Sequence, residues 1–221
     1  YKLVFSSSAT IYGIEGEEKI KEDFLKRPIN PYGNTKLTIE KILSDLYKSN
    51  PNLWGIAILR YFNPAGSHKS GLIGEDPRCA PTNLFPLIVK TGLKERSHLF
   101  IFGKDWPTSD GTCIRDFIHV TDLAKAHLAS LEFLSTNKPN IRKFNIGTGK
   151  GYSVLEVVKT FMKVNNLDIP YTFKERRKGD NYYAVANNLL ALSCLKWKPE
   201  KNLEDICRDS WNFVTKKNSK F

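Results

Sequence analysis

The sequence predicts an α/β fold built on a parallel sheet, and three segments near the N-terminus carry that prediction. Two short, nearly continuous apolar runs, at residues 2–5 and 54–59, are each followed by polar or turn residues. Such runs are typical of strands that are buried on both faces of a parallel sheet. Between them, residues 32–48 have helical periodicity, and Pro31 suits the first turn of a helix. The order strand, helix, strand is that of a crossover unit.

The predicted crossover helix carries Tyr32 and Lys36 four residues apart. This spacing places both side chains on one face of a helix, where the ammonium stabilises a phenolate and suits the tyrosine to accept a proton. The pair is common on ordinary helix faces, so its surroundings decide its meaning. Ligands of open α/β sheets bind beyond the carboxyl ends of the strands, which is where the serines at 6–8 and the turn at 63–66 fall.

Further along the chain, the segments at 100–102, 117–120 and 143–146 are predicted strands. A helix is expected to follow the second of them. Its N-cap is predicted to be Thr121 or Asp122, because short polar side chains accept hydrogen bonds from the first turn of a helix.

The glycine-rich run at 147–151 follows a predicted strand, but it fits neither the dinucleotide fingerprint nor the Walker pattern. Ser153 and Glu156, just after it, match a capping box at the start of an amphipathic helix. The run is therefore predicted to be a structural turn rather than a phosphate loop. His119 and His127 are interpreted as packing or capping residues.

Composition limits the possible functions of the chain. Its 221 residues are 41% hydrophobic, which is enough to build a core. The formal net charge of +11 comes from basic residues spread along the sequence, which favours a solvated basic surface over a nucleic-acid partner. No apolar stretch reaches the roughly 18 residues of a membrane span. The cysteines are scattered without Cys-x-x-Cys pairs, which predicts reduced thiols, no metal site and a cytoplasmic location: Cys79, Cys113, Cys194 and Cys207.

Five segments in a fixed order carry the strongest signal: FSSSATIYG at 5–13, PYGNTK at 31–36, LRYFNPAG at 59–66, GEDP at 74–77 and DGTCIRDFIHV at 110–120. Together they resemble the UDP-glucose 4-epimerase (UDP-galactose 4-epimerase) family of extended short-chain dehydrogenases. The resemblance covers almost the whole chain. It implies a doubly wound, Rossmann-type parallel sheet, of which this chain holds the C-terminal part, with a smaller α/β substrate domain.

The resemblance implies reversible epimerisation at carbon 4 of UDP-glucose and UDP-galactose through a 4-keto intermediate, with NAD as cofactor. Hydride transfer is required because the hydrogen on carbon 4 is not acidic. In the family, the catalytic roles fall on residues matching Tyr32 as base, Ser8 as partner of the sugar hydroxyl and Lys36. The residues implied to bind the cofactor are Ser6, Tyr32, Lys36, Tyr61 and Phe62.

The implied substrate site is built around the nucleotide. Guanidinium groups bind phosphate oxygens in pairs, which suits two arginines to the diphosphate. An aspartate of the Arg-Arg-Lys-Gly-Asp motif is implied to bind the ribose, and a small alanine beside the sugar implies that N-acetylated hexosamine nucleotides are also accepted. The implied substrate residues are Ser8, Asn63, Asn83, Leu84, Phe100, Phe102, Arg115, Arg177, Asp180 and Ala184. At position 117, where the family commonly has a tyrosine, this chain has phenylalanine.

Two other functions stay open: a UDP-pentose or UDP-uronate 4-epimerase, and a non-catalytic nucleotide-sugar-binding fragment. A 4,6-dehydratase is disfavoured, because residues 8–10 are Ser, Ala and Thr, whereas elimination needs carboxylates there.

The chain has no Gly-x-x-Gly-x-x-Gly loop, which family members carry in roughly a hundred further residues upstream. We therefore expect a chain without the NAD-fingerprint half, inactive alone, from an enzyme that is a homodimer at full length. Residues 1–66 are predicted to be the second half of the NAD-binding domain. Residues 67–221 are predicted to form the substrate domain, with about 115–150 returning to the sheet.

Overall fold

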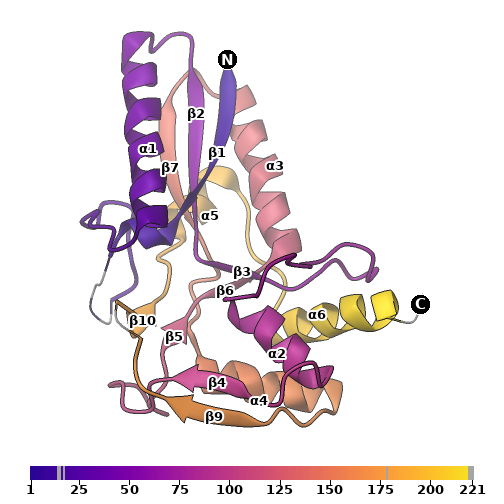
Figure 1. Cartoon of the computed structure of the whole chain (residues 1–221). Helices are drawn as coiled ribbons and strands as arrows, with labels where there is room; N and C mark the ends of the chain where they lie inside the picture. The colour runs from indigo at the N-terminus through magenta and orange to yellow at the C-terminus, as the bar shows by residue number, and fades with distance from the viewer. Residues whose placement is uncertain (14–15, 17, 178, 219–221) are drawn as a thin grey trace.

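The computed structural model describes residues 1–13, 16, 18–177 and 179–218. A three-stranded parallel sheet has the order β1-β2-β7, formed by β1 (Lys2–Ser8), β2 (Gly55–Tyr61) and β7 (Ile141–Ile146). Below it lies a cluster of helices and short strands (Figure 1). β2 is buried along most of its length because it has a strand on each side, whereas β1 is buried only at its serine end.

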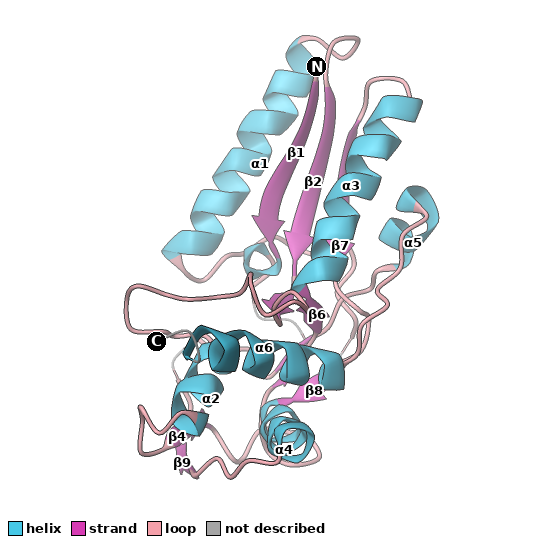
Figure 2. Ribbon diagram, turned by 90° about the vertical axis from the view of Figure 1, so that its right-hand side faces the viewer, coloured by secondary structure: helices cyan, strands magenta, loops and turns pink. Residues whose placement is uncertain are grey.

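Two long helices cover the sheet from opposite sides (Figure 2). They are α1 (Pro31–Ser49) and α3 (Val120–Thr136). The expected helix at 32–48 is confirmed. Its N-cap is Asn30, whose Oδ1 accepts a hydrogen bond of 2.7 Å from the backbone N–H of Gly33. A side chain at Gly33 would place its Cβ 2.7 Å from the carbonyl oxygen of Thr10, so glycine allows α1 to approach the short 3-10 helix η1 (Ala9–Ile11).

The lower part of the molecule contains α2 (Leu84–Gly92), α4 (Val154–Asn165) and α6 (Leu203–Asn218). Its strands form small pairings: β4 (Leu99–Phe102) with β9 (Tyr171–Lys174), β3 (Asn63–Ala65) with β6 (Phe117–His119), and β5 (Ile114–Arg115) between β8 (Tyr152–Ser153) and β10 (Tyr183–Ala184). The predicted capping box of α4 is present, with both reciprocal hydrogen bonds between Ser153 and Glu156.

Two of the three apolar clusters among the described residues correspond to the two parts. The core of the sheet lies between β2, β7 and α3, and it also receives Ala191 and Leu195 from α5 (Leu189–Leu195). The chain therefore returns to the sheet a second time near residue 190, which the sequence did not suggest. The other core lies among α2, α4, α6 and β4, around Ile88, Phe161 and Ile206.

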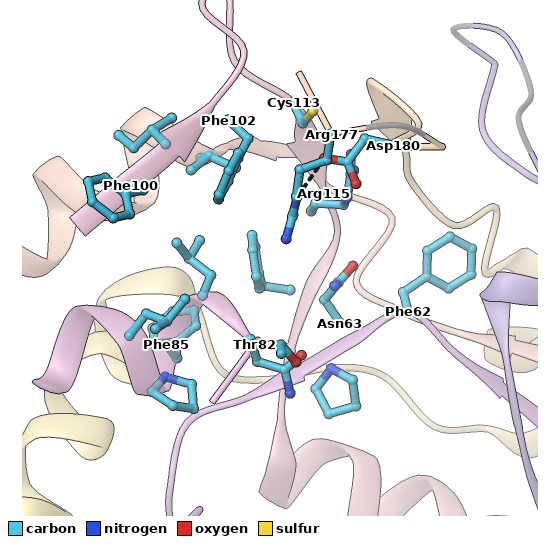
Figure 3. Close-up of a pocket in the computed structure, with 18 of the residues that line it drawn as sticks. Phe62, Asn63, Thr82, Phe85, Phe100, Phe102, Cys113, Arg115, Arg177 and Asp180 are labelled. Atoms are coloured by element: carbon cyan, nitrogen blue, oxygen red, sulfur yellow. Dashed lines mark hydrogen bonds and ion pairs between the residues drawn. The ribbon is translucent and has the colours of Figure 1, made fainter. Parts of the chain in front are cut away.

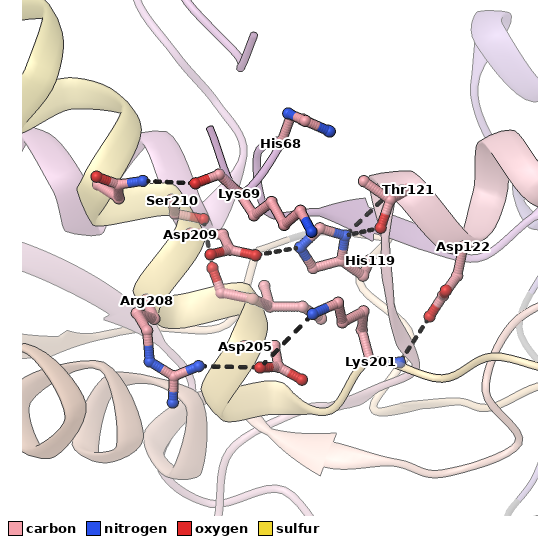
Figure 4. Close-up of polar contacts among 12 residues, drawn as sticks. His68, Lys69, His119, Thr121, Asp122, Lys201, Asp205, Arg208, Asp209 and Ser210 are labelled. Atoms are coloured by element: carbon pink, nitrogen blue, oxygen red, sulfur yellow. Dashed lines mark hydrogen bonds and ion pairs between the residues drawn. The ribbon is translucent and has the colours of Figure 1, made fainter. Parts of the chain in front are cut away.

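The predicted N-cap of α3 is wrong, because His119, not Thr121 or Asp122, caps the helix. Its Nδ1 accepts hydrogen bonds from the N–H of Thr121 at 3.1 Å and from the hydroxyl of Thr121 at 2.8 Å. Its Nε2 lies 3.2 Å from Oδ2 of Asp209 on α6 (Figure 4). The imidazole, fully buried, thus ties β6 and the start of α3 to α6.

Candidate active site

Ser8 ends β1 at the carboxyl edge of the sheet, and it is buried. Its Oγ accepts hydrogen bonds from the hydroxyl of Thr10 at 3.0 Å and from the backbone N–H of Thr10 at 3.3 Å. Ser8 is thereby the N-cap of η1, which fixes the direction of its side chain. The oxygen can still donate its own hydrogen to a ligand.

Tyr32 and Lys36 lie together on one face of α1, as their spacing predicts. The Lys36 Nζ lies 5.4 Å from the centre of the Tyr32 ring and 5.3 Å from that of Phe5. It donates a hydrogen bond of 2.8 Å to the backbone carbonyl of Ser6. The lysine is therefore anchored to β1 beside the serines, while Tyr32 is 55% exposed and can be reached from outside.

A cavity of about 420 Å³ opens beyond the carboxyl ends of β1 and β2 (Figure 3). It brings the catalytic candidates Ser8 and Tyr32 into the same space as most of the predicted nucleotide-binding residues. The predicted residues that line it are Ser8, Tyr32, Phe62, Asn63, Asn83, Leu84, Phe100, Phe102, Arg115, Arg177 and Asp180.

A second cavity of about 210 Å³ adjoins the first. The two share five lining residues, Ser8, Phe62, Asn63, Arg115 and Asp180. Tyr61 and Ala184 line the second cavity but not the first. Ala184 therefore lines a cavity with Ser8, but not the cavity that Phe100 and Phe102 line.

The two predicted diphosphate arginines reach the cavity from different strands and loops. Arg177 follows β9; its Nε lies 3.1 Å from Oδ2 of Asp180, and its guanidinium stacks 4.6 Å above the Phe102 ring. Arg115, on β5, donates from Nη1 to the carbonyl of Ile114 at 2.9 Å. Because the Arg177 ion pair uses Nε, its two terminal nitrogens can still face phosphate oxygens. Lys178, within the same motif, lies outside the described residues.

Two of the predicted cofactor residues, Lys36 and Tyr61, contact Ser6. Tyr61, at the end of β2, donates a hydrogen bond of 2.8 Å to the Ser6 hydroxyl and also contacts Nε2 of His127 on α3. Burial raises the pKa of Tyr61, and burial lowers that of His127. His127, interpreted from the sequence as a packing or capping residue, thus contacts a predicted cofactor residue.

The glycine-rich turn at 147–151 holds a carboxylate of the chain itself. Asp116, fully buried, accepts hydrogen bonds from the N–H and hydroxyl of Thr148, from the N–H of Gly149 and from the N–H of Ala186. A Cβ at Gly147 would lie 2.6 Å from an Asp116 carboxylate oxygen. Because Asp116 occupies these donors, the turn cannot bind a phosphate in this conformation.

Several cavity residues were not identified from the sequence. Glu75 lies within the GEDP segment at 74–77 and Thr82 directly precedes the predicted residue Asn83, so their positions in the sequence could have suggested them. Cys113 is buried and lines the cavity, and Phe117, noted from the sequence only as a departure from the family, packs edge-on against Phe85 with ring centres 5.6 Å apart. These contacts depend on tertiary packing, which no local pattern predicts. Within the described part of the chain, no group of three or more His, Cys, Asp or Glu side chains could hold a metal ion, and no helix could span a membrane.

Comparison with known proteins gives the family. Residues 1–147 match the model of the NAD dependent epimerase/dehydratase family, and this segment contains the sheet, Ser8, Tyr32 and Lys36. The chain belongs to that family. This epimerase/dehydratase chain is 50% identical over 212 residues to UDP-glucose 4-epimerase from Dictyostelium discoideum and 48% identical over 212 residues to that from Bacillus subtilis (strain 168). It covers 61% and 62% of those proteins, so it spans about three fifths of their length.

Solved structures of family members superpose closely. A UDP-glucose 4-epimerase from Stenotrophomonas maltophila, with bound NAD and formylated UDP-arabinopyranose, matches with a TM-score of 0.96 and 42% identity. The match covers 100% of this chain and 65% of that one. The enzyme from Bifidobacterium longum, in complex with NAD+ and UDP, gives a TM-score of 0.92 and 44% identity over 100% of this chain and 65% of that one. The expected α/β fold with a Rossmann-type sheet is confirmed.

Proposed function

We propose that the protein containing this chain interconverts UDP-glucose and UDP-galactose by inverting carbon 4 of the sugar, with NAD as cofactor. The observation that carries this proposal is the shared cavity, whose lining includes Tyr32 and Ser8 as well as Arg115 and Arg177. A nucleotide sugar needs both kinds of group, a proton acceptor at the hexose and cations at the diphosphate. Relatives named UDP-glucose 4-epimerase support the reaction.

In this proposal, Tyr32 accepts the proton of the sugar hydroxyl on carbon 4, and Ser8 holds that hydroxyl by a hydrogen bond. Lys36 stabilises the phenolate electrostatically, because its ammonium lies on the same helix face. Arg115 and Arg177 hold the diphosphate while the sugar turns over to present its other face. The nucleotide therefore stays bound during inversion.

The side chains near Ser6 fit the nicotinamide end of NAD. Lys36 has three ammonium hydrogens and gives one to the Ser6 carbonyl, so two can bind ribose hydroxyls. Tyr61 and Phe62 offer a phenol and an aromatic edge at the same end of the sheet. When bound there, NAD supplies the redox chemistry that makes carbon 4 a ketone and restores the alcohol.

We also propose the wider organisation implied by the family. Residues 1–66, with about 115–150, belong to an NAD-binding domain, and the remainder of 67–221 forms the substrate domain. The full-length protein is proposed to be a cytoplasmic homodimer.

The test is a Tyr32→Phe substitution in the full-length protein. Phenylalanine keeps the ring but removes the proton acceptor, so turnover of UDP-galactose should fall by about a hundred-fold or more. UDP affinity, measured by calorimetry, should stay close to that of the wild type. Turnover equal to that of the wild type would remove Tyr32 from the mechanism, and no turnover in the wild type would refute the proposed function.

A further inference from the structure

We infer that Ser7, Glu40 and Arg60 form a buried network that positions Tyr32 and Lys36 for the reaction. The inference rests on the proposed function. None of these three side chains lines the cavities described above, so in this view they act through the catalytic side chains. Each comes from a different element: β1, α1 and β2 respectively.

The network is centred on a two-point ion pair. Arg60 donates from Nε to Oε1 of Glu40 at 3.0 Å and from Nη2 to Oε2 at 2.7 Å. The Ser7 hydroxyl donates to the same Oε1 at 2.6 Å. The side chains of Arg60 and Glu40 are 0% and 3% exposed. Such parallel, charge-assisted hydrogen bonds fix orientation as well as distance.

The remaining guanidinium nitrogen extends the network across the sheet. Nη1 of Arg60 donates to the Tyr12 hydroxyl at 2.7 Å and to the Glu22 carbonyl at 2.8 Å. Tyr12 in turn donates to Oδ1 of Asn145, on β7, at 2.6 Å. Burial raises the pKa of Tyr12 despite the opposing charge of Arg60, so the phenol keeps its proton and can donate it. All three guanidinium nitrogens of Arg60 therefore donate hydrogen bonds.

The position of Glu40 on α1 explains why the network matters for the site. Gly33 and Glu40 are the buried residues of this helix, and they are seven residues apart, which is about two turns. Gly33 packs against Thr10, and Glu40 is bound to Arg60 and Ser7. Lys36 lies between these two anchor points on the same side of the helix, and Tyr32 precedes the first of them.

The same network also fixes the serine strand. Ser7, bound to Glu40, lies between Ser6, whose carbonyl binds Lys36, and Ser8, the predicted partner of the sugar hydroxyl. One carboxylate thus sets the distance between the helix that carries the base and the strand that carries its partner. Stability alone does not require a charged pair here, because replacing a buried ion pair by well-packed apolar side chains often leaves the folding stability unchanged or raises it.

The experiment compares three variants of the full-length, NAD-bound protein: Glu40→Gln, Ser7→Ala and Asp209→Asn. Glu40→Gln keeps the shape but turns one accepting oxygen into a donor that opposes Arg60. Ser7→Ala removes one hydroxyl from the network. Asp209→Asn is the control, because it weakens the buried contact between Asp209, on α6, and His119, which is remote from the network. Turnover is expressed per UDP-binding site counted by calorimetry, so unfolded molecules do not contribute.

Glu40→Gln should lower kcat by about ten- to a hundred-fold, since a displacement of the order of 1 Å has effects of this size. KM and UDP affinity should not change, because the UDP-binding residues lie on other elements. Ser7→Ala should lower kcat in the same direction by less, and Asp209→Asn should keep the wild-type kcat.

The inference is overturned if Glu40→Gln keeps the wild-type kcat per site, or if Asp209→Asn loses as much. If Glu40→Gln does not fold, Ser7→Ala decides: a kcat equal to that of the wild type overturns the inference. A wild type without epimerase activity would instead reject the proposed function, and the inference with it.

Discussion

Arg177 is the cation whose proposed contribution to substrate binding can be measured most simply. It lines the cavity, stacks on Phe102 and pairs with Asp180 through a single nitrogen. Arg177→Ala should weaken UDP binding by about 1.5–3 kcal/mol, the range for losing a hydrogen bond to a charged group. The salt dependence of binding should also decrease, because a contact with phosphate is lost. Calorimetry with UDP at two salt concentrations measures both effects.

The preceding residue provides a matched control. Arg176 pairs with Asp105 at 2.9 Å and stacks 4.0 Å above Trp106, away from the residues that line the cavity. Arg176→Ala should leave UDP affinity nearly unchanged. Equal losses in the two variants would mean that general positive charge, and not a contact of Arg177, attracts the nucleotide.

Ala184 tests the choice of sugar. It lines the same cavity as Ser8. In the proposed function the hexose binds here, so a large side chain at this position would meet one of its substituents. We predict that the wild type also converts UDP-GlcNAc, and that Ala184→Tyr lowers its turnover relative to UDP-glucose by about ten-fold or more, since packed pockets resist added volume. Paired assays on the two substrates measure the ratio.

The control for this prediction is Ala184→Ser, which adds one small atom and should keep the ratio. A wild type that ignores UDP-GlcNAc would refute the prediction. A tyrosine variant with the wild-type ratio would show that Ala184 does not limit the pocket.

At the scale of elements, His119 joins β6 and α3 to α6 as a neutral side chain. Burial lowers the pKa of His119, opposed by the nearby charge of Asp209 and Asp122 and reinforced by Lys201. Protonation would place a hydrogen on Nδ1, which now accepts from Thr121. The unfolded chain binds this proton more readily, so stability should fall as the pH drops below about 6.5.

His119→Asn should flatten this part of the pH dependence, because asparagine can still accept the capping hydrogen bond but does not titrate. Thermal unfolding between pH 7.5 and 5, both chosen as roughly one unit or more from the ordinary histidine pKa, measures the slope. His98→Asn, at an exposed histidine, is the control and should keep the wild-type slope. The same steep loss of stability in His119→Asn would assign the effect to other groups.

Elements with a local signal were predictable from the sequence. Asn30 and Pro31 mark the start of α1, and Ser153 with Glu156 marks that of α4, because caps depend on residues close in sequence. The N-cap of α3 was not predictable in the same way, because a histidine acts as a cap here only while α6 holds its other nitrogen.

At the scale of the whole molecule, the same distinction explains which parts of the site were found. The resemblance identified eleven of the residues that line the cavity, among them Ser8, Arg177 and Asp180. It did not predict that Asp116 fills the glycine-rich turn, that α5 returns to the sheet, or that His127 contacts Tyr61. These contacts join segments tens of residues apart, and only the folded chain brings them together.

The central claim is that carbon 4 is inverted by removing and returning the same hydrogen, while Tyr32 handles only the hydroxyl proton. The direct measurement uses UDP-glucose that carries deuterium on carbon 4, with the full-length protein in ordinary water. The UDP-galactose formed should retain the deuterium on carbon 4, because a transferred hydride does not exchange with solvent. Replacement of that deuterium by hydrogen from water would mean direct deprotonation of the carbon, and would contradict the account.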